Sequence, residues 1–321
     1  MVVCTRRRPA QLRQCLESVI ALNYPRFSIL VVENDSAHGE AEGIARAFGA
    51  SYRLCTQQGL SAARNVGARY CSSDLLAFLD DDAVCDPDWL LNAAPLFEDE
   101  RVYVVPGKVT FHSDASCASQ PTHEFDPGNR IVDRATDDWL GMTVFGGVGL
   151  GGNFIVRSSS VEEMGGFDER LGRGTRLHAS EENLFLFRVV DAGYRVATSS
   201  GCVVRHPDTS QDAEVPMRAI AVSTAMVALV AIEYPQHLGR LARYLWGAIR
   251  RTPQPWRRRP VQMFEGMASR RQVYLALLWG PFLYILAAIR HLVNGTPSLE
   301  EGRIQTAERV GATGEAPKMR A

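Results

Sequence analysis

Three consecutive aspartates, Asp80, Asp81 and Asp82, follow directly on an apolar run at residues 75–79. Adjacent carboxylates repel one another, so the arrangement costs stability unless a cation lies among them. Carboxylate oxygens are also the ligands that hard divalent cations prefer. The three residues therefore predict a metal site. The alternative is an acidic N-cap for the helix pattern that follows, a task that Asp86 could perform alone.

Strand-like and helix-like segments alternate around these aspartates. They come in the order strand 2–5, helix 9–22, strand 27–34, helix 35–50, strand 52–56, helix 59–73 and strand 75–79. This alternation predicts βαβ crossovers and a mixed, mostly parallel sheet flanked by helices, which is an α/β fold. Ligands bind such sheets at the carboxyl ends of the strands. Thr5, Asn34 and the three aspartates all fall at those ends.

The second part of the chain is also rich in strand patterns. Apolar runs at 101–111 and 151–157 are followed by a helix pattern at 180–194 and a last strand pattern at 195–207. The polar segment 112–142 lies between the first two runs and predicts a long, mobile loop.

Composition divides the chain near residue 215, where Ala, Leu, Val and Arg become dominant. We expect an α/β domain over 1–215 in two halves, 1–110 and 111–215. A helical region over 216–293 and a disordered tail over 294–321 complete the predicted organisation.

The charge of the chain is unevenly distributed. The 321 residues are 46% hydrophobic and 22% charged, as in ordinary globular proteins, and their formal net charge is −1. Residues 216–293, however, hold 11 arginines against only Glu233 and Glu265. Such asymmetry indicates an acidic part and a basic part that meets phosphates, either of nucleic acid or of a membrane surface. No nucleic-acid recognition motif accompanies the arginines, so we expect no nucleic-acid partner.

Two apolar stretches, 217–233 and 273–289, frame these arginines. Each is shorter than the roughly 20 apolar residues that a transmembrane helix needs. Short apolar helices with arginines and with Trp246 and Trp256 fit a monotopic attachment to an anionic cytoplasmic membrane. The alternative is that the helices pack against the α/β domain or a second subunit, so an oligomer is also considered.

The seven cysteines indicate a cytoplasmic protein. They are odd in number, scattered along the chain, and lack the spacing of a zinc site. Cys4, Cys71 and Cys202 lie beside apolar runs, as small buried side chains do. With the basic region, this predicts a protein held peripherally on the inner face of the cell membrane.

The order of the motifs resembles that of the family 2 inverting glycosyltransferases, which have the GT-A fold. The resemblance covers residues 1 to about 207 and is carried by "VVCTRRRPAQLRQCLESV", "YPRFSILVVENDS", "GLSAARNVGARYCSSDLLAFLDDDAVCDPDWL", "GGNFIVRSSSVEEMGGFDERLG", "EENLFLFRVVDAGYRVA" and "VVRHP". It implies that residues 1–110 bind a nucleotide-sugar and that 111–215 form the acceptor and catalytic half. Six motifs in the expected order make this a strong signal.

In this family the aspartate cluster holds a divalent cation on the diphosphate of the donor. The resemblance therefore implies that Asp82 binds Mg²⁺ or Mn²⁺, and that Asp80 and Asp81 reach the ribose, or the metal through water. His206 closes the last strand in "VVRHP", where relatives often place a histidine near the metal. The alternative for His206 is a structural role.

The resemblance assigns further residues to the donor. Thr5, Arg6 and Asn34 match positions that line the nucleotide base pocket, although "ENDS" around Asn34 is also a good turn sequence. Arg64 matches a residue that faces the donor and could pair with phosphate. It could equally be an arginine on the helix surface.

Glu181 and Glu182 stand where the family carries its acidic pair, and Glu182 is our candidate for the base that deprotonates the acceptor. Relatives usually have aspartate there, so which glutamate acts stays open. Acidic residues at a helix start also offset the macrodipole, a role compatible with catalysis. Gly152 and Asn153 match the segment under the sugar and acceptor, and a loop hinge is the alternative explanation.

The resemblance implies a metal-dependent, inverting transfer from a nucleotide-sugar, with a UDP- or dTDP-sugar favoured. The expected acceptor is a hydroxyl, which a lipid could carry, in polysaccharide, glycolipid or other glycoconjugate synthesis. A second hypothesis is a catalytically silent GT-A module that scaffolds a membrane assembly. A sugar-phosphate nucleotidyltransferase is disfavoured, because "CTRRRPAQL" lacks the glycines of its phosphate loop.

Overall fold

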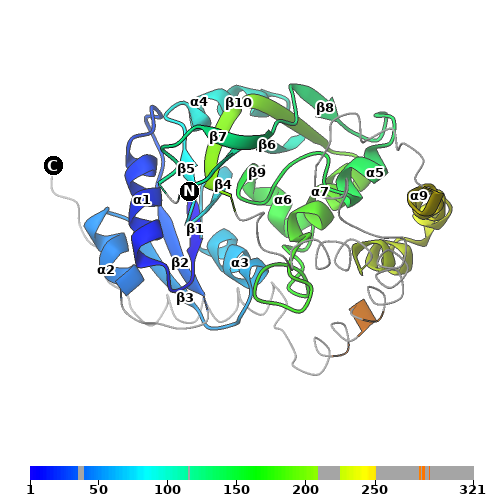
Figure 1. Cartoon of the computed structure of the whole chain (residues 1–321), viewed down its shortest axis with the longest axis horizontal. Helices are drawn as coiled ribbons and strands as arrows, with labels where there is room; N and C mark the ends of the chain where they lie inside the picture. The colour runs from blue at the N-terminus through cyan, green and yellow to red at the C-terminus, as the bar shows by residue number, and fades with distance from the viewer. Residues whose placement is uncertain are drawn as a thin grey trace.

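The computed structural model describes residues 1–34, 40–114, 116–208 and 225–250, together with residues 282, 284, 285 and 289. Ten strands form one mixed sheet with helices on both faces (Figure 1). Its strand order is β3-β2-β1-β4-β9-β6-β10-β5, with β7 paired to β6 and β8 paired to β10. The predicted α/β fold, with a mixed, mostly parallel sheet flanked by helices, is confirmed.

The first half of the sheet is parallel and follows the predicted alternation. It consists of β1 (Val2–Thr5), α1 (Pro9–Ile20), β2 (Leu30–Asn34), α2 (Glu40–Ala47), β3 (Ser51–Cys55), α3 (Leu60–Tyr70) and β4 (Leu75–Asp80). Strands β3, β2, β1 and β4 are paired in parallel, so their carboxyl ends meet at one edge.

The second half mixes parallel and antiparallel pairs. It consists of β5 (Val84–Cys85), α4 (Trp89–Ala93), the 3₁₀ turn η1 (Ala94–Glu98), β6 (Val102–His112), β7 (Pro121–Phe125), β8 (Arg130–Val132), α5 (Trp139–Val144), β9 (Asn153–Arg157), α6 (Ser158–Glu163), α7 (Glu181–Asp191) and β10 (Arg195–Pro207). Strand β9 runs antiparallel between β4 and β6, whereas β10 is parallel to β6. The long β10 therefore ends near the carboxyl ends of the first half.

Alternating side chains of the strands build a core on each face of the sheet. Val3 and Leu79 point to the face covered by α1, α2 and α4. Val2 and Phe78 point to the opposite face, which α3, α5, α6 and α7 cover. In Figure 1, α1 and α2 accordingly lie on the other side of the sheet from α3. The strands are held from both sides, which fixes the residues at their ends.

The segment 112–142 differs from the predicted loop. It contains β7, β8 and the start of α5. Strand β7 pairs with the end of β6, and β8 pairs with β10. The long strands β6 and β10 offer backbone groups that a neighbour must satisfy, so short polar stretches become edge strands there. Sequence patterns alone do not reveal such pairing.

The described part of the C-terminal region packs on the α/β domain. Residues 225–233 are helical, and η2 (Pro235–His237) and α9 (Leu238–Arg250) follow. Met226 and Leu241 join the core under α5 and α7. The imidazole Nε2 of His237 lies 2.9 Å from a carboxylate oxygen of Asp191. The prediction of helical packing against the domain is thus supported for these residues.

No helix of the described residues combines the length and the apolarity that crossing a bilayer takes. The other residues of 216–293, and all of the tail 294–321, lie outside the described part of the chain, so the division near residue 215 stays a prediction. All seven cysteines are free thiols, and Cys4 and Cys202 are buried as expected, while Cys71 is half-buried.

Asn153 ties three strands and a helix together from a fully buried position. Its Oδ1 accepts a hydrogen bond of 2.8 Å from the indole of Trp89. Its Nδ2 donates to the carbonyl oxygens of Lys108, at 2.7 Å, and Cys202, at 2.9 Å. The amide therefore satisfies polar groups of α4, β6 and β10 from β9.

We predict that Asn153→Ala destabilises the fold by about 3 kcal/mol or more, because the indole N–H and two carbonyl groups lose buried partners. Denaturant unfolding of the purified protein measures this. Asn92→Ala is the matched control, since Asn92 donates one exposed hydrogen bond to Gly201. An equal, small effect of both substitutions would contradict the structural role of Asn153.

Candidate active site

The three aspartates lie where β4 ends and the chain turns. Asp80 is the last residue of β4, and Asp81 and Asp82 form the turn after it. The hydroxyl of Thr5 donates to Asp81 at 2.7 Å from the end of β1. Arg8 donates to Asp81 at 3.2 Å and to Asp82 at 2.6 Å. The carboxyl ends of β1 and β4 thus build one acidic site, as their sequence positions predict.

Arg8 was not among the residues that the sequence singled out. The chain turns at Arg7, whose φ of 57° is in the left-handed region, and this directs Arg8 toward the aspartates. Arg6, the predicted donor residue, is exposed, and its contact with a nucleotide stays a prediction. The run "TRRRP" indicates that a positively charged side chain follows β1, but it does not show which arginine points toward the aspartates.

His206 brings a nitrogen ligand to the aspartates from β10. Its Nε2 lies 3.0 Å from Oδ1 of Asp82, and its Nδ1 lies 2.7 Å from the carbonyl oxygen of Pro207. Because Nδ1 faces a carbonyl, it carries a proton, and Nε2 donates to Asp82 when the ring is protonated. Burial lowers the pKa of His206, but the hydrogen bond and charge of Asp82 outweigh this and raise it. Loss of the Nε2 proton leaves that nitrogen able to bind a metal, while Nδ1–H keeps its contact with Pro207.

One ligand atom each from Asp80, Asp82 and His206 can be chosen so that all three lie within 4.8 Å of one another. We call these three residues the metal group. Two carboxylates and an imidazole are ligands suited to Mg²⁺ or Mn²⁺, so the donor set fits the expected cation.

The surroundings of the metal group shift the pKa values of Asp81 and Asp82 in opposite directions. Burial raises the pKa of Asp81 to about 6, although the hydrogen bond from Thr5 and the charge of Arg8 oppose this. Burial also raises the pKa of Asp82, but the hydrogen bond and charge of His206, with the charge of Arg8, hold it well below its ordinary value. Asp82 is therefore the more acidic of the two turn aspartates.

Arg64 connects the metal group to the acidic pair of α7. Its guanidinium donates to Glu181 at 2.7 Å, to Asp80 at 3.4 Å and to the carbonyl oxygen of Gly151 at 2.7 Å. Only 2% of its side chain is exposed, so the alternative of an arginine on the helix surface is wrong. Its predicted contact with phosphate stays a prediction.

The two glutamates at the start of α7 have different surroundings. Glu181 is buried, and its Oε1 is bound by Arg64, while its Oε2 has no hydrogen-bond partner among the described residues. Burial raises the pKa of Glu182, and the neighbouring charge of Glu181 raises it further, to about 8. Glu181 is thus engaged in an ion pair, and Glu182 is the one with the basicity of a proton acceptor near neutral pH.

The amide of Asn34 is used within the protein. Its Nδ2 donates to the carbonyl oxygen of Gln57 at 2.7 Å, and its Oδ1 accepts from the backbone N–H of Gly59 at 3.0 Å. These contacts hold the loop between β3 and α3. The turn role weighed for "ENDS" stays a prediction, because residues 35–39 lie outside the described part of the chain. Contact of Asn34 with a nucleotide base stays a prediction, as does that of Asn153 with sugar.

A cavity of about 370 Å³ lies beside the aspartates. It is lined by Thr5, Arg7, Arg8, Pro9, Leu12, Glu33, Glu40 and Ala41. Glu33 at its wall accepts a hydrogen bond of 2.6 Å from the hydroxyl of Tyr52. Small-molecule sites have volumes of about this size, and Thr5 and Arg8 join the cavity directly to the acidic turn. Glu33, a strand residue, carried no signal in the sequence.

The acidic turn lies within a region that matches a known protein family. The family model described as "Glycosyl transferase family 2" matches residues 1–165, about half of the chain. This chain belongs to glycosyl transferase family 2. The resemblance seen in the motifs is thereby confirmed, and Thr5, Arg64 and the three aspartates of this family 2 chain all lie inside the matched residues.

Relatives and solved structures agree with the family. The chain is 28% identical to "Glycosyltransferase AglE" of Haloferax volcanii over 61% of this chain and 62% of the relative. It is 36% identical to "Succinoglycan biosynthesis protein ExoM" of Rhizobium meliloti over 34% of this chain and 38% of that relative. The chain thus spans less than two thirds of the length of these curated relatives.

Two solved structures share the GT-A fold. S. aureus TarS 1–349 in complex with UDP-GlcNAc has a TM-score of 0.53 at 13% identity, covering 91% of both chains. The mannosyltransferase PcManGT from Pyrobaculum calidifontis, in complex with GDP-Man and Mn²⁺, has a TM-score of 0.51 at 15% identity, covering 96% of this chain and 79% of that one.

Gly152 permits the position of Asp80. A Cβ atom on Gly152 would lie 2.7 Å from Oδ2 of Asp80, closer than such atoms approach. We predict that Gly152→Ala displaces this carboxylate and weakens Mn²⁺ binding roughly tenfold, the effect typical of residues that orient metal ligands. Calorimetric titration with Mn²⁺ measures the affinity. Gly43→Ala is the control, because nothing lies within 4 Å of the added Cβ. Unchanged Mn²⁺ affinity in Gly152→Ala would contradict the assignment of Asp80.

Proposed function

We propose that this family 2 chain transfers a sugar, with inversion, from a nucleoside-diphosphate donor to a hydroxyl group. One observation carries the proposal: Arg64 contacts both Asp80 of the metal group and Glu181 beside the candidate base. The group suited to a diphosphate and the group suited to deprotonation are therefore neighbours in one site. An inverting transfer needs such a pair on two sides of the anomeric carbon.

The donor is proposed to lie across the carboxyl ends of the strands. Its nucleoside would occupy the cavity lined by Thr5, Arg8 and Glu33, beside the acidic turn. Asp80, Asp82 and His206 would hold the divalent cation, which neutralises the charge that develops on the departing diphosphate. Arg8 and Arg64 balance part of the charge of the carboxylates and keep them oriented.

Glu182 is proposed as the base. Its carboxylate takes the proton of the acceptor hydroxyl as that oxygen forms a bond to the anomeric carbon, and the bond from this carbon to the diphosphate breaks on the opposite face. The start of α7 orients the carboxyl group, which accepts a hydrogen bond from its own backbone N–H. Glu181 pairs with Arg64 and therefore has a supporting role. The proposed base is then Glu182, whose side chain is one methylene longer than the aspartate that relatives usually carry there.

A catalytically silent scaffold is less well supported. A silent module needs neither clustered metal ligands nor a carboxyl group of raised pKa, and this chain has both. The relatives favour glycoconjugate synthesis: ExoM is a succinoglycan biosynthesis protein, and RfbN of Salmonella typhimurium is an O-antigen chain rhamnosyltransferase. We infer a UDP- or dTDP-sugar as the donor.

We also propose peripheral attachment to the inner face of the membrane, where a lipid could carry the acceptor. The described C-terminal residues place large apolar side chains at the surface, among them Ile232, Leu238, Ile285 and Ile289, each about half exposed or more. Arg243 is exposed on α9 nearby in the chain. Exposed apolar and basic side chains together suit an anionic lipid surface.

We predict that Asp82→Asn lowers metal-dependent sugar transfer roughly 100-fold or more, since charge stabilisation by a metal is worth several kcal/mol. Calorimetry with UDP, dTDP and GDP, each with and without Mn²⁺, tests the same assignment by binding. Wild type should bind one of them only with Mn²⁺, and Asp82→Asn should lose that dependence. Asp86→Asn is the control outside the metal group. Undiminished transfer by Asp82→Asn would overturn the metal assignment.

The raised pKa of Glu182 predicts the pH dependence of transfer. The carboxyl group is protonated below its pKa and cannot then accept a proton, so kcat/KM should fall as the pH falls through about 8. Glu182→Gln should lose roughly 100-fold or more of the rate, and should lose this acidic limb. An acidic limb near the ordinary glutamate pKa of about 4.3 would argue against Glu182 as the base.

A further inference from the structure

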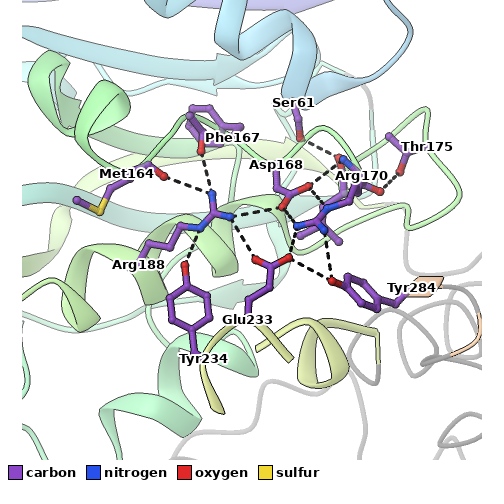
Figure 2. Close-up of polar contacts among 12 residues, drawn as sticks. Ser61, Met164, Phe167, Asp168, Arg170, Thr175, Arg188, Glu233, Tyr234 and Tyr284 are labelled. Carbon is purple, nitrogen blue, oxygen red and sulfur yellow. Dashed lines mark hydrogen bonds and ion pairs between the residues drawn. The ribbon is translucent and has the colours of Figure 1, made fainter. Parts of the chain in front are cut away.

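A network of charged side chains joins the C-terminal region to the α/β domain (Figure 2). Asp168 accepts hydrogen bonds from Arg170, at 2.8 and 2.5 Å, and from Arg188 of α7, at 3.5 Å. Arg170 also donates to Glu233 at 2.7 Å and to the hydroxyl of Tyr284 at 3.3 Å. Figure 2 shows Glu233 between the two arginines. Glu233 and Tyr284 belong to the C-terminal region, whereas the other three residues belong to the domain.

The network is balanced in charge and largely removed from water. Two arginines face two carboxylates, and only 6% of the Asp168 side chain and 15% of the Arg170 side chain are exposed, against 29% for Glu233. The hydroxyl of Tyr284 donates to Glu233 at 3.2 Å, and the Arg170 guanidinium lies over the Tyr284 ring, 5.4 Å from its centre. Such charge-assisted contacts fix side-chain geometry more firmly than exposed ion pairs do.

Arg170 begins a loop that closes on itself, residues 170–177, which we call the Arg170 loop. The hydroxyl of Thr175 lies within hydrogen-bond distance of the carbonyl oxygens of Arg170, Gly172 and Leu177. The backbone N–H of Gly172 donates to the carbonyl oxygen of Leu177 at 2.8 Å. Because these bonds tie the two ends of the loop together, the contacts of Arg170 place the loop as one unit.

The Arg170 loop packs against the start of α3. The hydroxyl of Ser61, a fully buried residue, donates to the carbonyl oxygen of Leu171 at 2.8 Å. The backbone N–H of Leu60 donates to the carbonyl oxygen of Arg173 at 2.9 Å. The loop is therefore fixed to the helix that also carries Arg64.

The Arg170 loop also forms a wall against the acidic pair of α7. A Cβ atom on Gly172 would lie 3.2 Å from the carboxyl carbon and from Oε2 of Glu181, so a larger residue would push on this carboxylate. Oε2 is the oxygen without a hydrogen-bond partner among the described residues, whereas Oε1 is bound by Arg64. On the side of Oε2, packing against Gly172 therefore keeps the carboxylate turned toward Arg64.

Helix α7 is held by the same network. Arg188 lies about two turns after Glu181 in this helix. Its guanidinium lies 3.9 Å from a carboxylate oxygen of Glu233 and donates to the hydroxyl of Tyr234 at 3.2 Å. The C-terminal region thus contacts both the loop that packs on Glu181 and the helix that carries Glu181.

We propose that Glu233 and Tyr284 of the C-terminal region are positioning residues for the acidic pair at the start of α7. Through the two arginines of the network they fix the Arg170 loop against the helix. This holds Glu181 on its partner guanidinium and Glu182 in place to accept a proton. The inference rests on the proposed function, in which Glu182 is the base. Neither Glu233 nor Tyr284 contacts the reacting groups, so both act on turnover and not on nucleotide binding.

The decisive experiment separates turnover from nucleotide affinity. Wild type, Glu233→Gln and Tyr284→Phe of the full chain are titrated calorimetrically with UDP, dTDP and GDP, each with Mn²⁺. Release of nucleoside diphosphate from UDP-glucose, UDP-N-acetylglucosamine, dTDP-glucose and GDP-mannose is followed in parallel, with water and methyl glucoside as hydroxyl acceptors. We expect kcat to fall about tenfold in Glu233→Gln and about threefold in Tyr284→Phe, because a displaced base costs turnover. Nucleotide affinity should stay within about twofold of wild type.

A double-mutant cycle tests whether the effect passes through Glu181. Glu181→Gln removes the charge that pairs with Arg64 and should itself lower kcat. In this background Glu233→Gln should add little, because the network then has no ion pair left to hold in place.

Two matched controls and one melting curve separate positioning from folding. Glu42 pairs with Arg46 on the surface of α2, and Tyr70 is 47% exposed at the end of α3. Glu42→Gln and Tyr70→Phe should therefore leave kcat and affinity unchanged. Tyr284→Phe removes one hydroxyl from the network and should keep the melting temperature of wild type, so that a lower kcat in this variant reflects positioning.

The possible outcomes lead to different conclusions. Wild-type kcat in Glu233→Gln and Tyr284→Phe, or a parallel loss of nucleotide affinity and kcat, overturns the positioning role while the proposed function stands. Equal losses from Glu233→Gln with and without Glu181→Gln do the same. A wild type that binds none of the three nucleotides, or that turns over none of the four donors, overturns the proposed function and the positioning role with it.

Discussion

The arrangement of the active site depends on the contacts of the buried Arg64 guanidinium. Asp80 and Glu181 come from different elements, and Arg64 is within 3.4 Å of one and 2.7 Å of the other. Two carboxylates held near each other repel one another unless a cation lies between them. The guanidinium of Arg64 supplies that positive charge and holds the two side chains close. Breaking such a buried pair is costly, because it leaves an uncompensated charge behind.

The fold and the acidic site differ in how far the sequence predicts them. Periodicity predicts βαβ units, and the carboxyl ends of parallel strands meet, so the sequence alone predicts that Thr5 and Asp81 lie together. The pairing of Arg64 with Glu181, 117 residues apart, has no local signature. The hydrogen bonds of the Asn153 amide and the pairing of Arg8 with the aspartates are likewise tertiary contacts without a local signature. Sequence patterns therefore place residues at an edge, and packing decides which side chains face the ligand.

Two adjacent glutamates illustrate how surroundings separate chemically identical groups. Glu181 pairs with Arg64, whereas burial and the neighbouring charge of Glu181 raise the pKa of Glu182. The ion pair thus supports the metal side of the site and at the same time raises the basicity of its neighbour. A base with a pKa near the working pH is the more effective one. Our proposal of Glu182 over Glu181, a choice open in the sequence, rests on the contact of Arg64 with Glu181.

The match to the family model ends at residue 165, before several residues on which the proposed chemistry depends. Glu182 and His206 both come later in the chain. Membership of the family therefore does not by itself assign the base or the nitrogen ligand. The proposed roles of Glu182 and His206 rest on β10, which returns beside the acidic turn, and on α7, which begins beside Arg64. Ion pairs of Arg170 with Asp168 and Glu233 then join the segment before α7 to the C-terminal region, so residues beyond the family match also hold this part of the domain in place.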